Sequence, residues 1–163
     1  MKKIVLIPLF LTTLFFAQTD NNIEGVILNT PCKMEFTRSS KGLNNYSCTI
    51  QKDGDKIINY SVTAENMTSR MQNLSVSELK TFKDTYFTVV KNNSEANNET
   101  TTFINLSPSI KALKSKGTMN YQGQVIYTTT ITFLKNQKSY MFNVLTNIND
   151  GKILADLTNK IKL

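Results

Sequence analysis

The feature that most constrains this chain is a pair of alternating segments near its C-terminus, residues 125–134 and 140–148. In both, β-branched and aromatic residues recur at every second position, which is typical of strands with one buried face. A two-residue loop at Asn136 and Gln137 joins them, although Gln137 adopts a positive φ less readily than glycine and a longer loop is the alternative. With the short loop, the cross-strand pairs are Lys135 with Lys138, Phe133 with Tyr140, Ile131 with Phe142, and Thr129 with Val144. We therefore predict a long antiparallel hairpin whose apolar residues share one face.

The other face of this hairpin is polar, and we expect it to face water. Its side chains are those of Thr128, Thr130, Thr132, Ser139 and Asn143. One polar and one apolar face favour an antiparallel sheet, because parallel sheets are usually buried on both faces.

Residues 1–18 have the pattern of a secretory signal peptide. Lys2 and Lys3 precede an apolar run, and a small residue follows it, which predicts cleavage near Ala17 or Gln18. A membrane anchor is the alternative, but the run is shorter than the ~20 residues of a typical span. No cysteine follows the run, so lipoprotein processing is excluded. Its LFFAQ ending resembles bacterial signal peptides common in Bacteroidetes. We expect residues 19–163 to form one secreted or periplasmic domain without a transmembrane segment.

The chain has two cysteines, Cys32 and Cys48. In an exported protein an even number of cysteines predicts a disulfide. Segments 32–36 and 46–50 can pair as a hairpin that brings the two thiols together, and the bridge would then stabilise the fold by about 3 kcal/mol. Two buried free thiols are the alternative. We expect no metal site, because the chain has no histidine to complete a ligand set.

The N-terminal half is predicted to be a meander followed by a helix. Short alternating runs indicate strands at 23–29, 32–36, 46–50 and 58–64. Ser75 and Glu78 have the spacing of a capping box, which predicts a helix that continues to about Lys91. Its apolar stripe comprises Leu79, Phe82, Tyr86, Val89 and Val90.

The C-terminal half is predicted to lead from a polar loop at 92–102 into the long hairpin. Gly117 and Gly123 indicate turns or bulges. After Gly151 we expect a final helix. Its apolar stripe comprises Ile153, Leu154, Leu157 and Ile161.

These elements predict an α+β fold, in which one twisted antiparallel sheet (a meander plus the long C-terminal hairpin) is packed by a mid-chain helix and a C-terminal helix. This order, with the terminal ADLTNKIKL segment, resembles the PsbP-like and DcrB-like family of small exported or lumenal domains. The resemblance concerns topology over most of the chain. The family is functionally diverse, so the resemblance implies no functional residue. A cystatin-like domain is the alternative, but there the helix usually precedes the sheet.

The residue types exclude several chemistries. Without histidine there is no Ser-His-Asp or Cys-His catalytic set, and the six scattered glycines form no nucleotide-binding motif. We predict no catalytic residue and no cofactor. A hydrolase that uses two carboxylates is the enzymatic alternative, with Glu35 and Glu65 on strand segments. Against it, the chain has no tryptophan to offer a carbohydrate platform.

The chain is basic, with a formal net charge of +7 that falls to +5 when the signal peptide is removed. Lys111, Lys114 and Lys116 occur together without an acidic neighbour. With Lys41, Lys135 or Lys138 they could form a patch for an anionic polymer or a membrane surface. We do not expect nucleic acid as a partner of an exported protein.

The sequence therefore predicts an exported, non-enzymatic binding or scaffolding domain. Its partner would be a protein or another envelope component, which the sequence does not identify. The contact would be the threonine-rich face of the hairpin or a groove between helix and sheet. A basic module and a carboxylate hydrolase are the alternatives.

Overall fold

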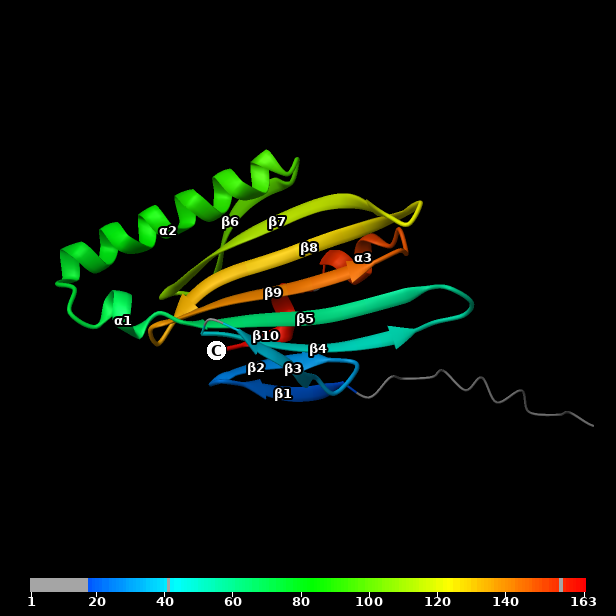
Figure 1. Cartoon of the computed structure of the whole chain (residues 1–163), viewed down its shortest axis with the longest axis horizontal. Helices are drawn as coiled ribbons and strands as arrows, with labels where there is room; N and C mark the ends of the chain where they lie inside the picture. The colour runs from blue at the N-terminus through cyan, green and yellow to red at the C-terminus, as the bar shows by residue number, and fades with distance from the viewer. Residues whose placement is uncertain (1–17, 41, 156) are drawn as a thin grey trace, which may run out of the picture.

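Seven antiparallel strands form the central sheet of the protein (Figure 1). They are β3 (Glu35–Ser40), β4 (Leu43–Gln51), β5 (Ile57–Asn66), β6 (Thr100–Ser107), β7 (Ile110–Tyr121), β8 (Gln124–Lys135) and β9 (Lys138–Thr146). Their order in the sheet is β3-β4-β5-β9-β8-β7-β6. This computed structural model describes residues 18–40, 42–155 and 157–163. The predicted signal peptide and Lys41 therefore lie outside the described residues, apart from Gln18.

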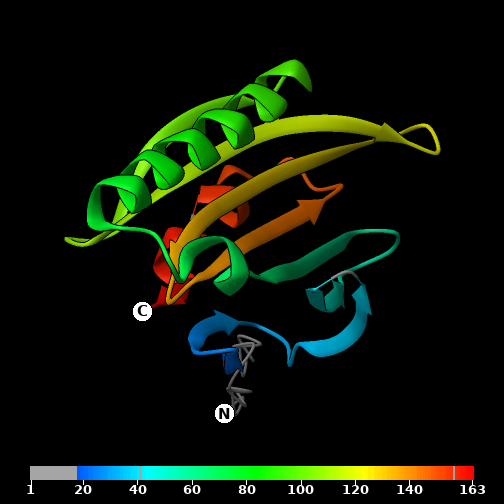
Figure 2. The same ribbon diagram turned by 60° about the vertical axis from the view of Figure 1, so that its left-hand side comes forward.

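One layer of structure covers each face of the central sheet (Figure 2). On one face lie the short helix α1 (Thr68–Met71) and the long helix α2 (Val76–Ala96). On the other face lies a three-stranded sheet of β1 (Thr19–Ile23), β2 (Val26–Thr30) and β10 (Ile161–Lys162). Helix α3 (Gly151–Ala155) and the 3₁₀ turn η1 (Thr158–Lys160) lead into β10. The α+β class with a twisted antiparallel sheet is confirmed, and the second sheet is an addition to it.

The long hairpin has the predicted register. Phe133 lies opposite Tyr140, Ile131 opposite Phe142, and Thr129 opposite Val144. Lys135 pairs with Lys138 across a two-residue loop. Both loop residues have positive φ, 50° at Asn136 and 58° at Gln137, which is the backbone of a type I′ turn. The turn matches the twist of the strands, so the loop needs no extra residue even with glutamine in the second position.

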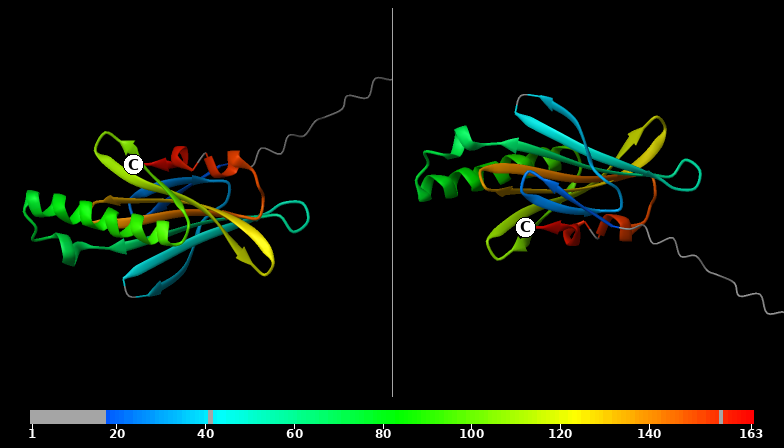
Figure 3. Two further views of the ribbon diagram at one scale, coloured as in Figure 1. Left: turned by 90° about the horizontal axis from the view of Figure 1, so that it is seen from above. Right: turned by 90° about the horizontal axis from the view of Figure 1, so that it is seen from below.

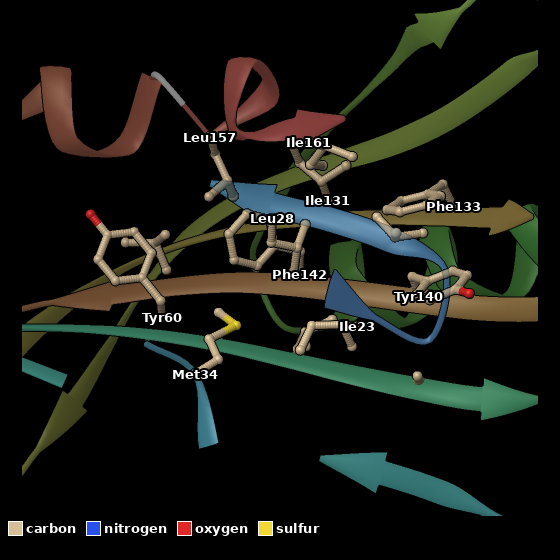
Figure 4. Packing of buried hydrophobic residues seen from close by; sticks show 14 of the residues in the cluster. Ile23, Leu28, Met34, Tyr60, Ile131, Phe133, Tyr140, Phe142, Leu157 and Ile161 are labelled. Carbon is tan, nitrogen blue, oxygen red and sulfur yellow. The ribbon is translucent and has the colours of Figure 1, made fainter. Parts of the chain in front are cut away.

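The larger core lies between the two sheets (Figure 4). The inward face of the long hairpin supplies Ile131, Phe133, Tyr140, Phe142 and Val144, all buried. The small sheet and the C-terminal segment close the core from the other side with Ile23, Val26, Leu28, Leu157 and Ile161. The aromatic rings of Phe133 and Tyr140 stack at a centroid distance of 5.1 Å.

A smaller core lies under α2, where Phe87 packs with Met67, Met71, Leu113 and Leu134. The predicted capping box is confirmed, since Ser75 and Glu78 each accept a hydrogen bond from the backbone of the other. The predicted stripe is wrong in one member, because Val89 is 52% exposed and Phe87 is buried instead.

The predicted polar loop at 92–102 is also wrong. The helix continues to Ala96 and ends where Asn98 adopts a φ of 60°, and β6 begins at Thr100. Left-handed asparagine is a common way to end a helix. The polar residues of this stretch continue the helix because Ser94 faces a serine hydroxyl of β7, as described below.

Both ends of the chain differ from prediction. The expected strand at 23–29 is a hairpin, β1 and β2, that turns at Glu24 and Gly25 with φ values of 51° and 95°. The expected final helix stops at Ala155, and the chain continues through η1 into β10, which pairs with β2. The C-terminal residues thus pair with the edge of the small sheet and do not form a further helical turn. The stripe residues Leu157 and Ile161 are still buried, as predicted.

The disulfide between Cys32 and Cys48 is confirmed, with an S–S distance of 2.10 Å and a Cα–Cα distance of 6.0 Å. Cys32 lies in the link between β2 and β3, so the bridge joins the small sheet to β4 of the central sheet. The backbone N–H of Met34, in the same link, donates to Asn21 Oδ1 of β1 at 2.7 Å.

Glu24 is a second connection between the sheets. Its carboxylate accepts hydrogen bonds from Lys138 Nζ at 2.8 Å, Asn44 Nδ2 at 2.8 Å and the Tyr46 hydroxyl at 3.1 Å. The Tyr140 hydroxyl donates to the backbone carbonyl of Glu24 at 2.9 Å. Burial raises the pKa of the Glu24 carboxyl, but the hydrogen bonds and the charge of Lys138 lower it by more, so that it lies below its ordinary value.

Replacing both cysteines by serine should lower the free energy of unfolding by about 3 kcal/mol, because the bridge closes a long loop in the unfolded chain. Urea unfolding would measure this. Reductant should destabilise the native protein and leave the double variant unchanged. A native protein insensitive to reductant would contradict the expectation.

Replacing Glu24 by glutamine should cost about 1–2 kcal/mol at neutral pH, because it removes a charge-assisted contact with Lys138. The contribution of ionised Glu24 is present above its unfolded-state pKa near 4.5. It is lost as the pH falls through the lower pKa of the folded state. Glu24→Gln should therefore lose less stability than the native protein on acidification, measured by urea unfolding at neutral and acidic pH. Glu35→Gln, at an exposed site of β3, is the control and should keep the full acid dependence.

Candidate functional site

Helix α2 covers only part of the polar face of the long hairpin (Figure 3). Thr132 and Ser139 are buried, whereas Thr128, Thr130 and Asn143 are half-buried. The expectation of a face exposed to water is therefore wrong for the covered residues. Polar side chains indicate exposure to water, but the helix covers these two residues, and Ser139 finds a hydrogen-bond partner in Tyr86 of α2.

Two hydroxyl contacts fix the position of α2 on the sheet. The hydroxyls of Tyr86 and Ser139 share a hydrogen bond of 2.5 Å, which ties the middle of the helix to β9. The hydroxyls of Ser94 and Ser115 share one of 3.0 Å, which ties its last turns to β7. The helix thus crosses from β9 towards β7 and leaves part of the hairpin uncovered beside its C-terminal half.

A groove of about 320 Å³ lies at this boundary, and we call it the helix–sheet groove. It is lined by Val90, Ser94, Glu99, Met119, Thr128, Thr130, Thr132, Met141, Asn143 and Leu145. The threonines follow each other at alternate positions of β8, so their hydroxyls recur about every 7 Å along the floor. Thr130 Oγ1 donates to Asn143 Oδ1 at 2.7 Å. The two methionines, from β7 and β9, supply flexible apolar walls.

Of the residues that line the groove, one, Glu99, has an ionisable side chain. It is half-buried, and within the described part of the chain its carboxylate has no ion pair. Its side chain lies against Gly117, where an added Cβ would be 2.9 Å from Glu99 Cγ and 3.5 Å from Thr128 Oγ1. The absent side chain at position 117 therefore makes room for Glu99 next to the threonine floor.

The prediction of a turn or bulge at Gly117 is wrong, because Gly117 lies in the regular β7 ladder opposite Thr128. Gly123 does lie in the turn between β7 and β8, with a φ of 79°. A glycine inside an alternating segment can equally signal the close approach of another side chain.

The predicted lysines do not share one face. Lys111 is on the same face of the central sheet as Leu113, which is the face that α2 covers. Lys114 and Lys116, which pair with Ile131 and Thr129 of β8, are on the face that the small sheet covers. Burial lowers the pKa of Lys114, and the nearby charge of Lys116 lowers it further.

Two of the lysines expected to join the patch, Lys135 and Lys138, are engaged elsewhere. Lys135 Nζ donates to the Gly25 carbonyl at 3.0 Å and Lys138 pairs with Glu24. Binding of an anionic surface by Lys111, Lys114 and Lys116 thus stays a prediction, with the three split between two faces.

The two carboxylates singled out in the sequence lie apart. Glu35 pairs with Ser47 in the middle of β4, whereas Glu65 of β5 lies opposite Leu43, the first residue of β4. Glu65 forms an ion pair with Arg70 at 3.2 Å. Within the described residues, no three or more acidic or cysteine side chains are grouped to hold a metal ion.

No protein-family model matches the chain, and no curated protein sequence matches it. A protein from Bacteroides thetaiotaomicron VPI-5482 aligns in structure over 84% of this chain and 44% of its own, with 11% identity and a TM-score of 0.46. A protein of unknown function from Pseudomonas aeruginosa aligns over 79% of this chain and 82% of its own, with 9% identity and a TM-score of 0.44. This chain thus spans less than half of the first protein. Neither similarity assigns a function. Among the described residues, no helix has the length and apolar character to cross a membrane.

Replacing Tyr86 by phenylalanine should lower the free energy of unfolding by about 1–3 kcal/mol, because the buried Ser139 hydroxyl loses its partner. Adding Ser139→Ala should recover part of the loss, since no hydroxyl is then left unpaired. Urea unfolding of the native protein, both single variants and the double variant gives this coupling. Tyr121→Phe, at an exposed position, is the control and should be nearly neutral. Strictly additive losses would contradict a direct contact.

Proposed function

We propose that the mature chain is an exported, non-enzymatic binding domain whose ligand site is the helix–sheet groove. The observation that carries this proposal is the lining of the groove. It combines an unpaired carboxylate, a row of hydroxyls and flexible apolar walls. Such a mixture fits recognition, in which a few polar groups orient a ligand and apolar surface holds it.

The ligand that this lining suits best is an extended polypeptide segment. Alternate residues of an extended chain repeat about every 7 Å, which is also the spacing of the threonine hydroxyls on β8. Hydroxyl and amide groups can exchange hydrogen bonds with a peptide backbone. A lysine, arginine or terminal amine of the ligand would pair with Glu99.

Two observations bear on where and how the protein works. A disulfide is typical of oxidising compartments, and together with the signal-peptide pattern it supports a secreted or periplasmic location. The groove has one carboxylate and no second acid among its lining residues, so no observation favours the carboxylate hydrolase. The resemblance to the PsbP-like and DcrB-like family remains an expectation from topology.

The test is a selection of random dodecapeptides displayed on phage against residues 19–163. We expect enrichment of peptides that carry a basic residue among apolar ones. Thr128→Trp, which fills the groove, should abolish binding of the selected peptides. Thr49→Trp is the matched control, because Thr49 is on the same face but on β4, two strands beyond β9.

Glu99→Gln should keep peptide binding but weaken it by about tenfold, through loss of one charge-assisted contact. It should also remove the preference for a basic residue in a repeated selection. Peptides whose binding is unchanged by Thr128→Trp, with both tryptophan variants folded by circular dichroism, would show that the groove is not the site.

A further inference from the structure

A second cavity lies under the N-terminal half of α2, at the turn between β6 and β7. Its volume is about 190 Å³. It is lined by Lys80, Lys83, Asp84, Phe87, Ser109, Ile110, Lys111 and Leu134. Apart from Lys111, none of these residues was singled out in the sequence as part of a site. We call this cavity the lysine pocket.

Three lysines and one aspartate, all exposed at the surface, contribute to the lining of the lysine pocket. In the described part of the chain, none of Lys80, Lys83, Lys111 and Asp84 takes part in an ion pair. The pocket therefore carries an excess of two positive charges that no protein group neutralises. An anion bound there would relieve their repulsion and gain attraction from several cations at once.

Aromatic contacts hold Lys111 in place. Its Nζ lies 3.9 Å from the centroid of the Phe103 ring, and this ring meets Phe87 edge-to-face at 6.0 Å. The ammonium of lysine has three N–H donors, and a cation–π contact with one ring face does not use all of them. Lys111 therefore retains N–H donors for a ligand. Ser109 adds a hydroxyl to the same lining.

The remainder of the lining is apolar. Phe87 and Leu134 are buried members of the core under α2, and Ile110 begins β7. A ligand that fills the pocket would thus present an anionic group to the lysines and an apolar group to these side chains.

We propose that the lysine pocket binds a phosphate ester, with the phosphate oxygens on Lys80, Lys83, Lys111 and Ser109 and the ester group on the apolar lining. A phosphate monoester suits this set better than a carboxylate, because its three terminal oxygens can accept from three lysines and a serine, whereas a carboxylate offers only two oxygens. The ester is either a free metabolite or a lipid headgroup, which share this chemistry. This site is independent of the helix–sheet groove.

The test is a calorimetric titration of residues 19–163 with phenyl phosphate at fixed ionic strength. Lys83→Gln/Lys111→Gln should weaken binding by about tenfold or more, since two charge-assisted contacts are lost. Lys52→Gln/Lys56→Gln is the matched control, because it removes the same charge at exposed positions of the turn between β4 and β5, outside the lining of the pocket, and should bind like the native protein. Asp84→Asn should tighten binding by removing the carboxylate from the pocket.

Sedimentation with vesicles distinguishes the two sources of the ester. Binding to phosphatidylglycerol vesicles but not to phosphatidylcholine vesicles, lost in Lys83→Gln/Lys111→Gln alone, would support the site with a lipid headgroup as its ligand. Phenyl phosphate binding without vesicle binding would support it with a free ester. If both double variants lose the same affinity, the binding depends on net charge and not on the pocket, which would overturn the proposal. Absence of binding to both phenyl phosphate and vesicles would overturn it as well.

Discussion

The pleat of the β8–β9 hairpin is the constraint on which the rest of the structure depends. Successive side chains of each strand point to opposite faces, so a single register commits one set to the core between the sheets and the other set to α2. Phe133 and Tyr140 stack in that core, while Ser139, the neighbour of Tyr140 in the chain, bonds to the helix. A slip of one residue would exchange the two sets. The two-residue turn fixes the register and with it both layers.

Attachment of the small sheet depends on contacts between residues that are distant in the chain. Lys138 and Tyr140 reach Glu24 across 114 and 116 residues. The disulfide adds a covalent link over a separation of 16 residues. Glu24 adopts a positive φ at the turn, which places its carboxylate over the central sheet. The turn therefore closes a hairpin and positions an ionic contact at the same time.

Helix α2 creates both candidate sites through its placement. Its serine and tyrosine contacts hold it at an angle across β7, β8 and β9, and the helix–sheet groove opens beside its C-terminal half. The lysine pocket lies under its N-terminal half. One face of the sheet thus offers an acidic groove and a basic pocket at opposite ends of the same helix. A single domain thus offers separate sites for two chemically different ligands.

Much of this fold could be predicted because local patterns specify it. The alternation of residues 125–134 and 140–148 determined the hairpin and its cross-strand pairs, Ser75 and Glu78 determined the start of α2, and two cysteines in a chain with an export signal pattern determined the disulfide. One further signal was present and was missed. Lys111 and Lys114 are an odd number of residues apart in a strand, which places them on opposite faces.

Other features were decided only by tertiary structure. The stretch at 92–96 is polar enough for a loop, yet it is helical because Ser94 finds Ser115 on β7. Ile161 continues the helical spacing of the apolar residues before it, yet it lies in strand β10, because β2 has an unpaired edge with which this segment can pair. Neither candidate site has a motif, because each gathers residues from α2 and from several strands. Local spacing determines which backbone hydrogen bonds a segment can form. Which side chains meet is decided only when the layers pack.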